Sequence, residues 1–414
     1  MNKLLRLNLF LLMVVAIIDP SDLLFHAKVP VFAGVWILFL ADILISTEGR
    51  FQVPTNLYLY LFVFVVLLPL IGMLVYALRG SGMEGYEGFR YYKSYLFLTL
   101  CIPLAIERID LVRPLSLILS VLSVVIILLD VLTAIDETLR LPLAAFGDAY
   151  VVFSLTDRSY GSLSYQSLYF HASPLLVIAI VYFCYQFLHS SRRAKLWNAL
   201  FLMLNVCGMA LSGTRNNVIV ALGAPLLVVA WYKGPRTRWA IAALLVLFIV
   251  AGFSAGVLQA MFSTDEYGNA VKLGHLHDYG VLLGDWRTLL FGQGLGASFF
   301  STAWGTRVSI TELTYLEIVR NYGIILAPFL FLLILYPLRV LTDQKAKTDH
   351  YLFLGYVCYL YLCSANPLLL SSTGMLVLAV VLYRTFCNTA GAPRRAGAAN
   401  IGLSSAGSFP RAMG

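Results

Sequence analysis

Charged side chains are scarce in this chain of 414 residues, where Asp, Glu, Lys and Arg together make up 12%. An ordinary soluble domain carries roughly 25% charged residues, whereas this chain is 60% hydrophobic. Such a low charge content excludes water as the main solvent of the folded protein. No stretch between the apolar runs has the length of a soluble domain, so the sequence indicates one membrane domain over residues 1–388.

Cysteine is also scarce, and its six copies all lie in apolar runs, at Cys101, Cys184, Cys207, Cys358, Cys363 and Cys387. A free buried cysteine behaves as a small hydrophobic residue. The sequence therefore predicts neither a disulfide framework nor a metal cluster, and no cofactor is expected.

Apolar runs of roughly the 20 residues that a transmembrane helix needs recur along the chain. They predict an all-α, polytopic integral membrane protein with about twelve transmembrane helices, followed by a disordered cytoplasmic tail over residues 389–414. The runs cover residues 4–18, 29–45, 57–78, 95–105, 111–135, 171–188, 196–211, 218–232, 239–258, 313–338, 351–364 and 368–386.

Lysine and arginine cluster in alternate loops, as in the group Arg192, Arg193 and Lys195. Because cytoplasmic loops retain basic residues, this pattern predicts a multi-pass membrane protein with both termini in the cytoplasm. The two long loops, 136–170 and 259–311, then face the outside. The net charge of +8 is explained by topology, so no nucleic-acid partner is expected, and the main partner is the lipid bilayer.

Some basic residues break this pattern because they fall on the external side. They are Lys28, Arg79, Arg90, Lys93, Arg140, Arg158, Arg215, Lys272, Arg287, Arg307 and Arg320. The guanidinium group binds phosphate through two parallel hydrogen bonds, which suits a lipid-linked diphosphate. The alternative is that each side chain merely reaches the headgroup region. Arg215 is the strongest candidate, because Leu211-Ser-Gly-Thr-Arg-Asn-Asn217 predicts a tight turn that fixes its position.

Two external segments add candidate binding residues. Arg90 and Lys93 lie on one face if a helix starts there, and they could bind a phosphate or pair with Glu84 and Glu87. The loop 136–170 is rich in aromatic residues, among them Tyr160 beside Arg158. Such rings stack on sugars or, alternatively, form the aromatic belt of the membrane interface.

The largest loop contains His275 and His277, which are too few ligands to indicate metal and are treated as substrate-binding candidates. Arg287 then precedes Phe291-Gly-Gln-Gly-Leu-Gly296, which predicts a compact turn that returns the chain to the membrane.

The next helix opens with Glu312, which has no obvious local partner and is the candidate catalytic base. Glu317 and Arg320 are three residues apart, so they could pair within the same helix.

Four pieces of this chain resemble the bacterial O-antigen polymerase and ligase superfamily. They are Ser212-Gly-Thr-Arg215, Arg287 with its following glycine motif, the helix from Glu312 to Asn321-Tyr-Gly323, and Asn366-Pro367. The resemblance covers about residues 200–385 and implies a GT-C-like glycosyltransferase of the bacterial inner membrane. Its implied substrates are an undecaprenyl-diphosphate-linked glycan donor and acceptor, and a chain-length regulator and a flippase are implied partners.

Under this resemblance Arg215 and Arg287 hold the donor diphosphate, Glu312 takes the proton of the attacking sugar hydroxyl, and no metal is needed. Arg90, Lys93, Arg158, Tyr160, His275, His277, Arg307 and Arg320 are the remaining substrate-binding candidates. Members of the ligase branch usually have histidine and asparagine where this chain has Glu312-Leu313, which favours the polymerase branch. The alternatives are ligase-type transfer to another acceptor, or a transporter or flippase that uses Asp42 or Asp130.

Overall fold

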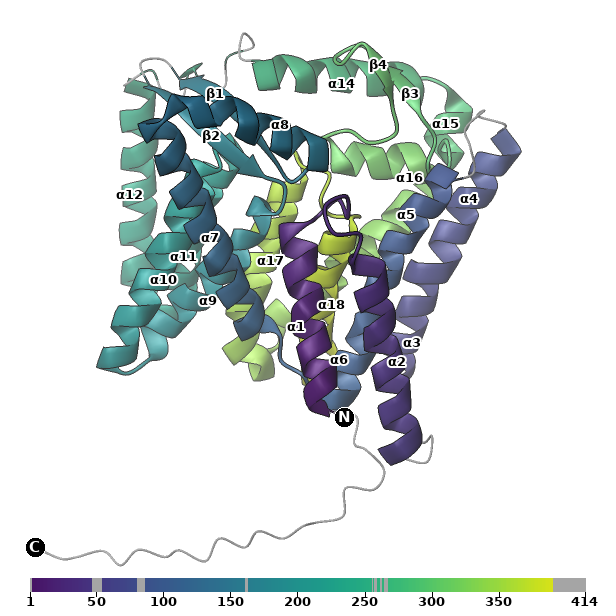
Figure 1. Ribbon diagram of the computed structural model, residues 1–414, viewed down its shortest axis with the longest axis horizontal. Helices are drawn as coiled ribbons and strands as arrows, with labels where there is room; N and C mark the ends of the chain where they lie inside the picture. Colours follow the sequence, from purple (N-terminus) through teal and green to yellow (C-terminus); the bar gives the residue numbers. More distant parts are fainter. Residues whose placement is uncertain are drawn as a thin grey trace, which may run out of the picture.

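The computed structural model describes residues 2–46, 54–79, 86–160, 163–254, 256, 259–260, 263 and 267–389. It is mostly helical, and each of the twelve apolar runs falls on one or more helices (Figure 1). The tail predicted to be disordered lies, after residue 389, outside the described residues.

The helices run back and forth between the two ends of a bundle (Figure 1). The first half contains α1 (Asn2–Ile18), α2 (Lys28–Ser46), α3 (Thr55–Leu61), the π-helical turn η1 (Phe62–Leu67), α4 (Leu68–Arg79), α5 (Tyr86–Leu96), η2 (Phe97–Leu100), α6 (Cys101–Glu107) and α7 (Val112–Ile135). The second half contains α9 (Leu176–His189), α10 (Arg192–Leu211), α11 (Arg215–Tyr232), α12 (Pro235–Ser254), α16 (Thr314–Leu335), η5 (Tyr336–Thr342), η6 (Gln344–Asp349), α17 (His350–Cys363) and α18 (Ser372–Thr389).

The two long loops fold into a cap on one end of this bundle, opposite the N-terminus (Figure 1). The loop 136–170 forms η3 (Glu137–Leu139), α8 (Arg140–Tyr150) and an antiparallel hairpin of β1 (Phe153–Tyr160) and β2 (Leu163–Phe170), and η4 (Ser173–Leu175) follows it. The loop 259–311 forms α14 (Tyr267–Leu283), α15 (Trp286–Phe291) and a short hairpin of β3 (Phe299–Ser301) and β4 (Thr306–Val308). The sequence analysis did not predict these strands, whose side chains are mostly polar or aromatic.

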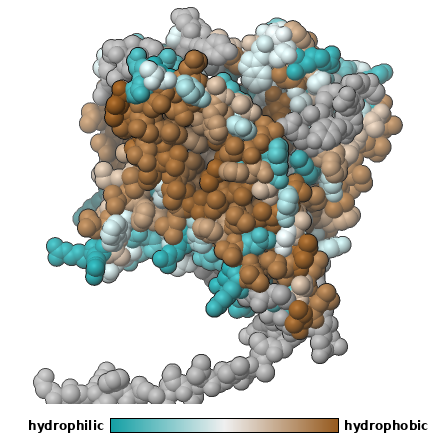
Figure 2. All heavy atoms as spheres, viewed as in Figure 1, coloured by the Kyte–Doolittle hydropathy of each residue, from teal (hydrophilic) through white to brown (hydrophobic). Residues whose placement is uncertain are grey.

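Apolar side chains cover the middle of the visible face, and hydrophilic ones gather at its upper and lower edges (Figure 2). Among the described residues, 7 helices are long and apolar enough to cross a membrane. The prediction of an all-α membrane protein is therefore confirmed, while the larger number of spans stays a prediction.

The centre of the bundle is formed by shorter helices. The run from Leu176 to Val181 in α9 is buried on every side, and α17 packs against both α9 and α11. A helix that is hydrophobic all round belongs in a core. An apolar run in the sequence therefore does not show by itself whether the helix lies in the core or faces the membrane.

The glycine motif forms the predicted compact turn, and it contacts α16 backbone to backbone. Gly292, Gly294 and Gly296 all have positive φ angles, of 78°, 91° and 89°. Gly323 interrupts α16 with φ 67° and ψ 171°, which frees carbonyl groups of the preceding turn. The N–H groups of Gln293 and Gly294 donate to two of them, Arg320 O at 2.6 Å and Asn321 O at 3.1 Å.

We expect Gly323→Ala to lower the free energy of unfolding by about 2 kcal/mol or more, because its backbone conformation is nearly exclusive to glycine. A Cβ at this position would also lie 2.2 Å from Leu290 O. Thermal unfolding in detergent measures the effect. Gly280→Ala on α14 is the matched control, since its Cβ would meet nothing within 4 Å. An equal loss in both variants would refute the close contact.

Candidate functional site

A cavity of about 330 Å³ lies where the cap meets the bundle. Its walls come from the connection between α1 and α2, the start of α2, α5, the end of β2, the entrance to α16, and the connection between α17 and α18. These segments are far apart in the sequence. The cavity is lined by both apolar and polar side chains, which suits an amphiphilic ligand.

Two lysines bring positive charge to this cavity. Lys28 is only 2% exposed, and its ammonium donates to Pro20 O and, at 3.2 Å, to Ser372 Oγ. An ammonium carries three donors, so one remains for a ligand. Asp22, which also lines the cavity, and Asp19 attract the Lys28 ammonium, and Lys93 lies close enough to repel it more weakly. Among the described residues, no carboxylate lies within ion-pair distance of Lys93.

Another wall of the cavity offers uncharged hydrogen-bonding groups. Tyr169 donates to Asn366 Oδ1 at 2.8 Å, and Asn366 O accepts from Thr314 Oγ1 at 2.8 Å. Burial, and then the nearby Glu312 carboxylate, raise the pKa of Tyr169, so its hydroxyl stays protonated. Burial lowers the pKa of His171, which keeps this imidazole neutral at pH 7. Neutral donors and acceptors of this kind match sugar hydroxyls.

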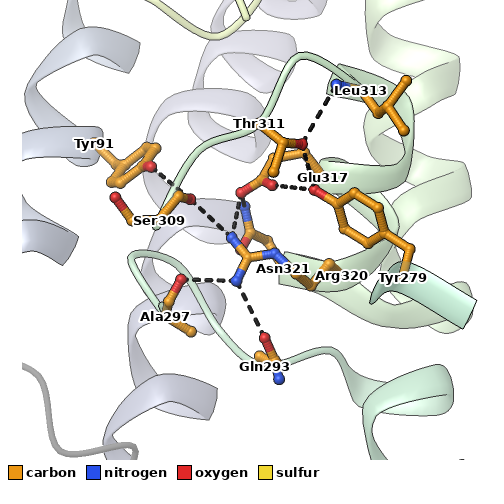
Figure 3. Close-up of polar contacts among 10 residues, drawn as sticks. All are labelled: Tyr91, Tyr279, Gln293, Ala297, Ser309, Thr311, Leu313, Glu317, Arg320 and Asn321. Atoms are coloured by element: carbon orange, nitrogen blue, oxygen red, sulfur yellow. Dashed lines mark hydrogen bonds and ion pairs between the residues drawn. The ribbon is translucent and has the colours of Figure 1, made fainter. Parts of the chain in front are cut away.

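The floor of the cavity rests on a cluster of buried polar groups that we call the Arg320 cluster (Figure 3). Its members are Tyr91, Tyr279, Gln293, Ala297, Ser309, Thr311, Glu317, Arg320 and Asn321. Arg320 is fully buried, and its Nη1 donates to Gln293 Oε1 at 3.1 Å and to Ala297 O at 2.7 Å. Its Nη2 donates to Ser309 O at 2.9 Å and to Glu317 Oε1. The guanidinium thus clamps both ends of the segment between α15 and α16.

Glu317 joins this cluster to the cavity, because it lines the cavity together with Asn321. Its carboxylate accepts from Arg320, from Asn321 Nδ2 at 3.1 Å and from Tyr279 Oη at 2.6 Å. Burial, followed by the charge of Glu317, raises the pKa of Tyr279. The pairing of Glu317 with Arg320 that the spacing allowed is present. Arg320, a substrate-binding candidate, donates its hydrogen bonds to other groups of the protein.

Glu312 has an ion-pair partner, although one that is distant in the sequence. Its Oε2 lies 4.0 Å from Lys272 Nζ on α14, which is 40 residues earlier and therefore not a local neighbour. The Glu312 carboxylate also lies near enough to Tyr169 to act on its hydroxyl electrostatically. The candidate base is therefore placed beside the cavity wall and outside the residues that line it.

The structure does not place Arg215 or Arg287 on the cavity lining. Arg215 is the first residue of α11, in the predicted tight turn, where Gly213 packs directly against Ser167 of β2. Arg287 is exposed at the start of α15, with its guanidinium 5.5 Å from the Trp286 ring. Lys93 is the candidate that the cavity includes.

The remaining candidates are spread over the cap. His275 is buried against Trp304, whose ring lies 4.6 Å away, whereas His277 is exposed beside Asp278. The two histidines therefore do not converge, and within the described residues no group of three or more possible ligands could hold a metal ion. Arg307 is exposed on β4. The side chains of Arg90, Arg158 and Tyr160 lie outside the described residues.

Sequence reasoning missed His171 and undervalued Lys28. Lys28 stood out as a charge that breaks the positive-inside pattern, but it was grouped with ten others. Nothing local marks His171, which sits at the start of an apolar run. Both residues become site candidates only because segments that are distant in the sequence fold next to them.

Removing the Arg320 charge should destabilise the protein strongly. We expect Arg320→Ala to cost about 3–5 kcal/mol of unfolding free energy, because Glu317 is left buried without its counter-charge. Thermal and denaturant unfolding in detergent measure this loss.

Two further variants test whether an uncompensated charge causes this loss of stability. Arg307→Ala, in the same segment, should change stability by less than about 0.5 kcal/mol because its side chain is exposed. The double variant Arg320→Met with Glu317→Gln should recover part of the loss. If it is less stable than Arg320→Ala alone, an uncompensated charge is not the cause.

Comparison with known proteins leaves this site to be interpreted from its own geometry. No family model matches the chain, and no curated protein matches it either.

Proposed function

We propose that this protein is a membrane glycosyltransferase that polymerises undecaprenyl-diphosphate-linked repeat units into a surface polysaccharide. This proposal places the cap at the external face of a bacterial inner membrane, and the reaction would take place there. The observation that carries the proposal is the cavity between cap and bundle. Its two lysines match a diphosphate, its neutral hydroxyl-binding groups match a sugar, and its apolar walls match a lipid chain.

The diphosphate would bind to Lys28 and Lys93. Lys28 is held in place by two hydrogen bonds, and Lys93 has no carboxylate partner among the described residues. Preorganised positive charge stabilises negative charge that grows as a leaving group departs. Arg215 and Arg287, which the family resemblance favours, stay in the proposal as cap residues that contact more distant parts of the donor or acceptor.

The sugar and the lipid would occupy the other walls. Tyr169, His171 and Asn366 offer hydrogen bonds to hydroxyl groups, and the aromatic rings offer a stacking surface. Val29, Phe97 and Leu370 give the polyprenyl chain an apolar exit. The cavity thus offers polar surface for a headgroup and apolar surface for the first part of its lipid.

In the proposed reaction an acceptor hydroxyl attacks the anomeric carbon of the donor. A new C–O bond forms there, the bond from that carbon to the diphosphate oxygen breaks, and the lipid diphosphate leaves with the bonding electrons. Glu312, beside Tyr169, would accept the proton of the attacking hydroxyl. Lys272, its ion-pair partner, would keep the carboxylate oriented until the acceptor binds.

The other functions differ in ways that can be observed. A ligase would use a second acceptor in place of another repeat unit. A transporter usually holds its charged groups near the middle of the bilayer. Asp42 is a buried carboxylate within α2, but the cavity lies at the end of the bundle, which favours chemistry at the membrane face.

Lys93→Gln should lower kcat/KM for polymerisation roughly tenfold to a hundredfold, because a charged hydrogen bond to the diphosphate is lost. The assay gives purified protein only lipid-linked repeat units and follows the ladder of chain lengths on a gel. Lys93→Arg should retain more activity than Lys93→Gln, since it keeps the charge.

Arg193→Gln is the control, because this exposed cation begins α10 at the other end of the bundle. Its ladder should match that of the unmodified protein. A normal ladder from Lys93→Gln would remove the cavity from the reaction. Wild-type protein that makes product only after a second acceptor is added would favour the ligase.

The proposed sidedness has its own test. Arg287→Cys on the cap should react with a membrane-impermeant maleimide in spheroplasts, whereas Arg236→Cys in the first turn of α12 should react only after the membrane is opened. Cys207, the exposed native cysteine, is first replaced by serine. The reverse labelling pattern would place the cap inside the cell and leave the proposed reaction without its substrates.

A further inference from the structure

A second hollow lies at the end of the bundle away from the cap, with a volume of about 560 Å³. It is bounded by the last turns of α11, the start of α12, η5, η6 and the first residue of α17. Arg238 and Lys347 are its two cations, Leu227 and Leu341 supply apolar surface, and Trp231 and His350 form a wall. We call this hollow the basic pocket.

The wall of the basic pocket is rigid because its hydrogen bonds are complete. Trp231 Nε1 donates to His350 Nδ1 at 3.1 Å, so the other ring nitrogen carries the proton and donates to Asp343 O at 3.0 Å. This pair of hydrogen bonds fixes the orientation of the His350 ring. Tyr232 Oη donates to Lys347 O at 3.0 Å, which holds the backbone of η6 beside α11.

The two cations retain donors for a ligand. Arg238 Nε donates to Ala230 O at 2.8 Å, and within the described residues its two terminal nitrogens have no partner. Lys347 is exposed. A guanidinium with both terminal nitrogens available, in the same hollow as an ammonium, matches the oxygens of a phosphate group.

Helix α12 borders one side of the pocket. None of its described side chains is buried, and this helix stands at the edge of the bundle next to α11 (Figure 1). Hydrocarbon chains can therefore lie along α12 while a headgroup sits between Arg238 and Lys347. A soluble anion would use the cations and leave this apolar flank unused.

We propose that the basic pocket binds the phosphate headgroup of an acidic phospholipid from the leaflet opposite the cap. The phosphate contacts Arg238 and Lys347, Trp231 borders the glycerol region, and the acyl chains follow α11 and α12. Such a lipid would fill the wedge between α12 and the rest of the bundle. The site is separate from the cavity, so its occupancy is independent of the proposed reaction.

Thermal unfolding of the purified full chain with added lipid tests the proposal. Short-chain phosphatidylglycerol in excess over its Kd should raise the Tm by about 5 °C relative to phosphatidylcholine. The double variant Arg238→Gln with Lys347→Gln should lose this increment. Arg236→Gln, an exposed cation of the same helix turn that does not line the pocket, should keep it.

Further additions to the same assay distinguish the possible sources of phosphate. Glycerol phosphate or inorganic phosphate at equal concentration should give no shift if the acyl chains contribute as proposed. A full shift with either one would overturn the lipid assignment and make the ligand a free phosphate. Equal Tm values with acidic and neutral lipid, or an undiminished increment in the double variant, would refute the site.

Discussion

The buried ion pair between Arg320 and Glu317 is the constraint on which the arrangement of the cap depends. A guanidinium that is 0% exposed carries a large desolvation cost, which only close partners offset. Four acceptors, from Gln293, Ala297, Ser309 and Glu317, surround its two terminal nitrogens. Each acceptor lies on α16 or on the segment that leads to it. The charge therefore forces that segment to fold back onto the kinked helix.

The same pair fixes one side of the cavity. Ser309 O accepts from Arg320 and also, at 2.8 Å, from Tyr91 Oη, which lies two residues before Lys93 on α5. Glu317 meanwhile holds Tyr279 of α14 and presents its own side chain to the cavity floor. One buried charge thus places α5, α14 and α16 relative to each other. The position of Lys93 depends on an arginine that contacts no ligand in this arrangement.

The sequence was informative where the physics is local. Apolar runs located the helices because a bilayer-sized stretch needs no knowledge of its neighbours. The glycines at 292, 294 and 296 predicted a turn through their own conformational freedom. The spacing of Glu317 and Arg320 predicted a pair because three residues make less than one helical turn. Apolar runs predict the number of spans less well than the positions of the helices, because core helices such as α9 are apolar where they pack against other helices.

The cavity could not be predicted, because its contacts join distant parts of the chain. Lys28 binds Ser372, which is 344 residues away, and Tyr169 binds Asn366, which is 197 residues away. The sequence analysis also favoured arginine over lysine as the phosphate-binding residue, because the guanidinium binds phosphate through two parallel hydrogen bonds. In the folded chain Arg215 lies half-buried at the start of α11 and Arg287 is exposed on α15, whereas Lys28 and Lys93 line the cavity. Residue chemistry alone therefore does not show which candidates reach the cavity.

The two lysines also argue for the charge of the proposed ligand. Lys93 repels the Lys28 ammonium, but Asp22 and Asp19 each attract that ammonium more strongly than Lys93 repels it. Asp22 also lines the cavity, so the protein itself already offsets part of the Lys28 charge. Lys93 has no carboxylate within ion-pair distance among the described residues, so it is the cation whose charge a bound ligand would offset most. The proposed diphosphate would supply that negative charge, and the neutral Tyr169 wall would face the hydroxyl groups of the sugar.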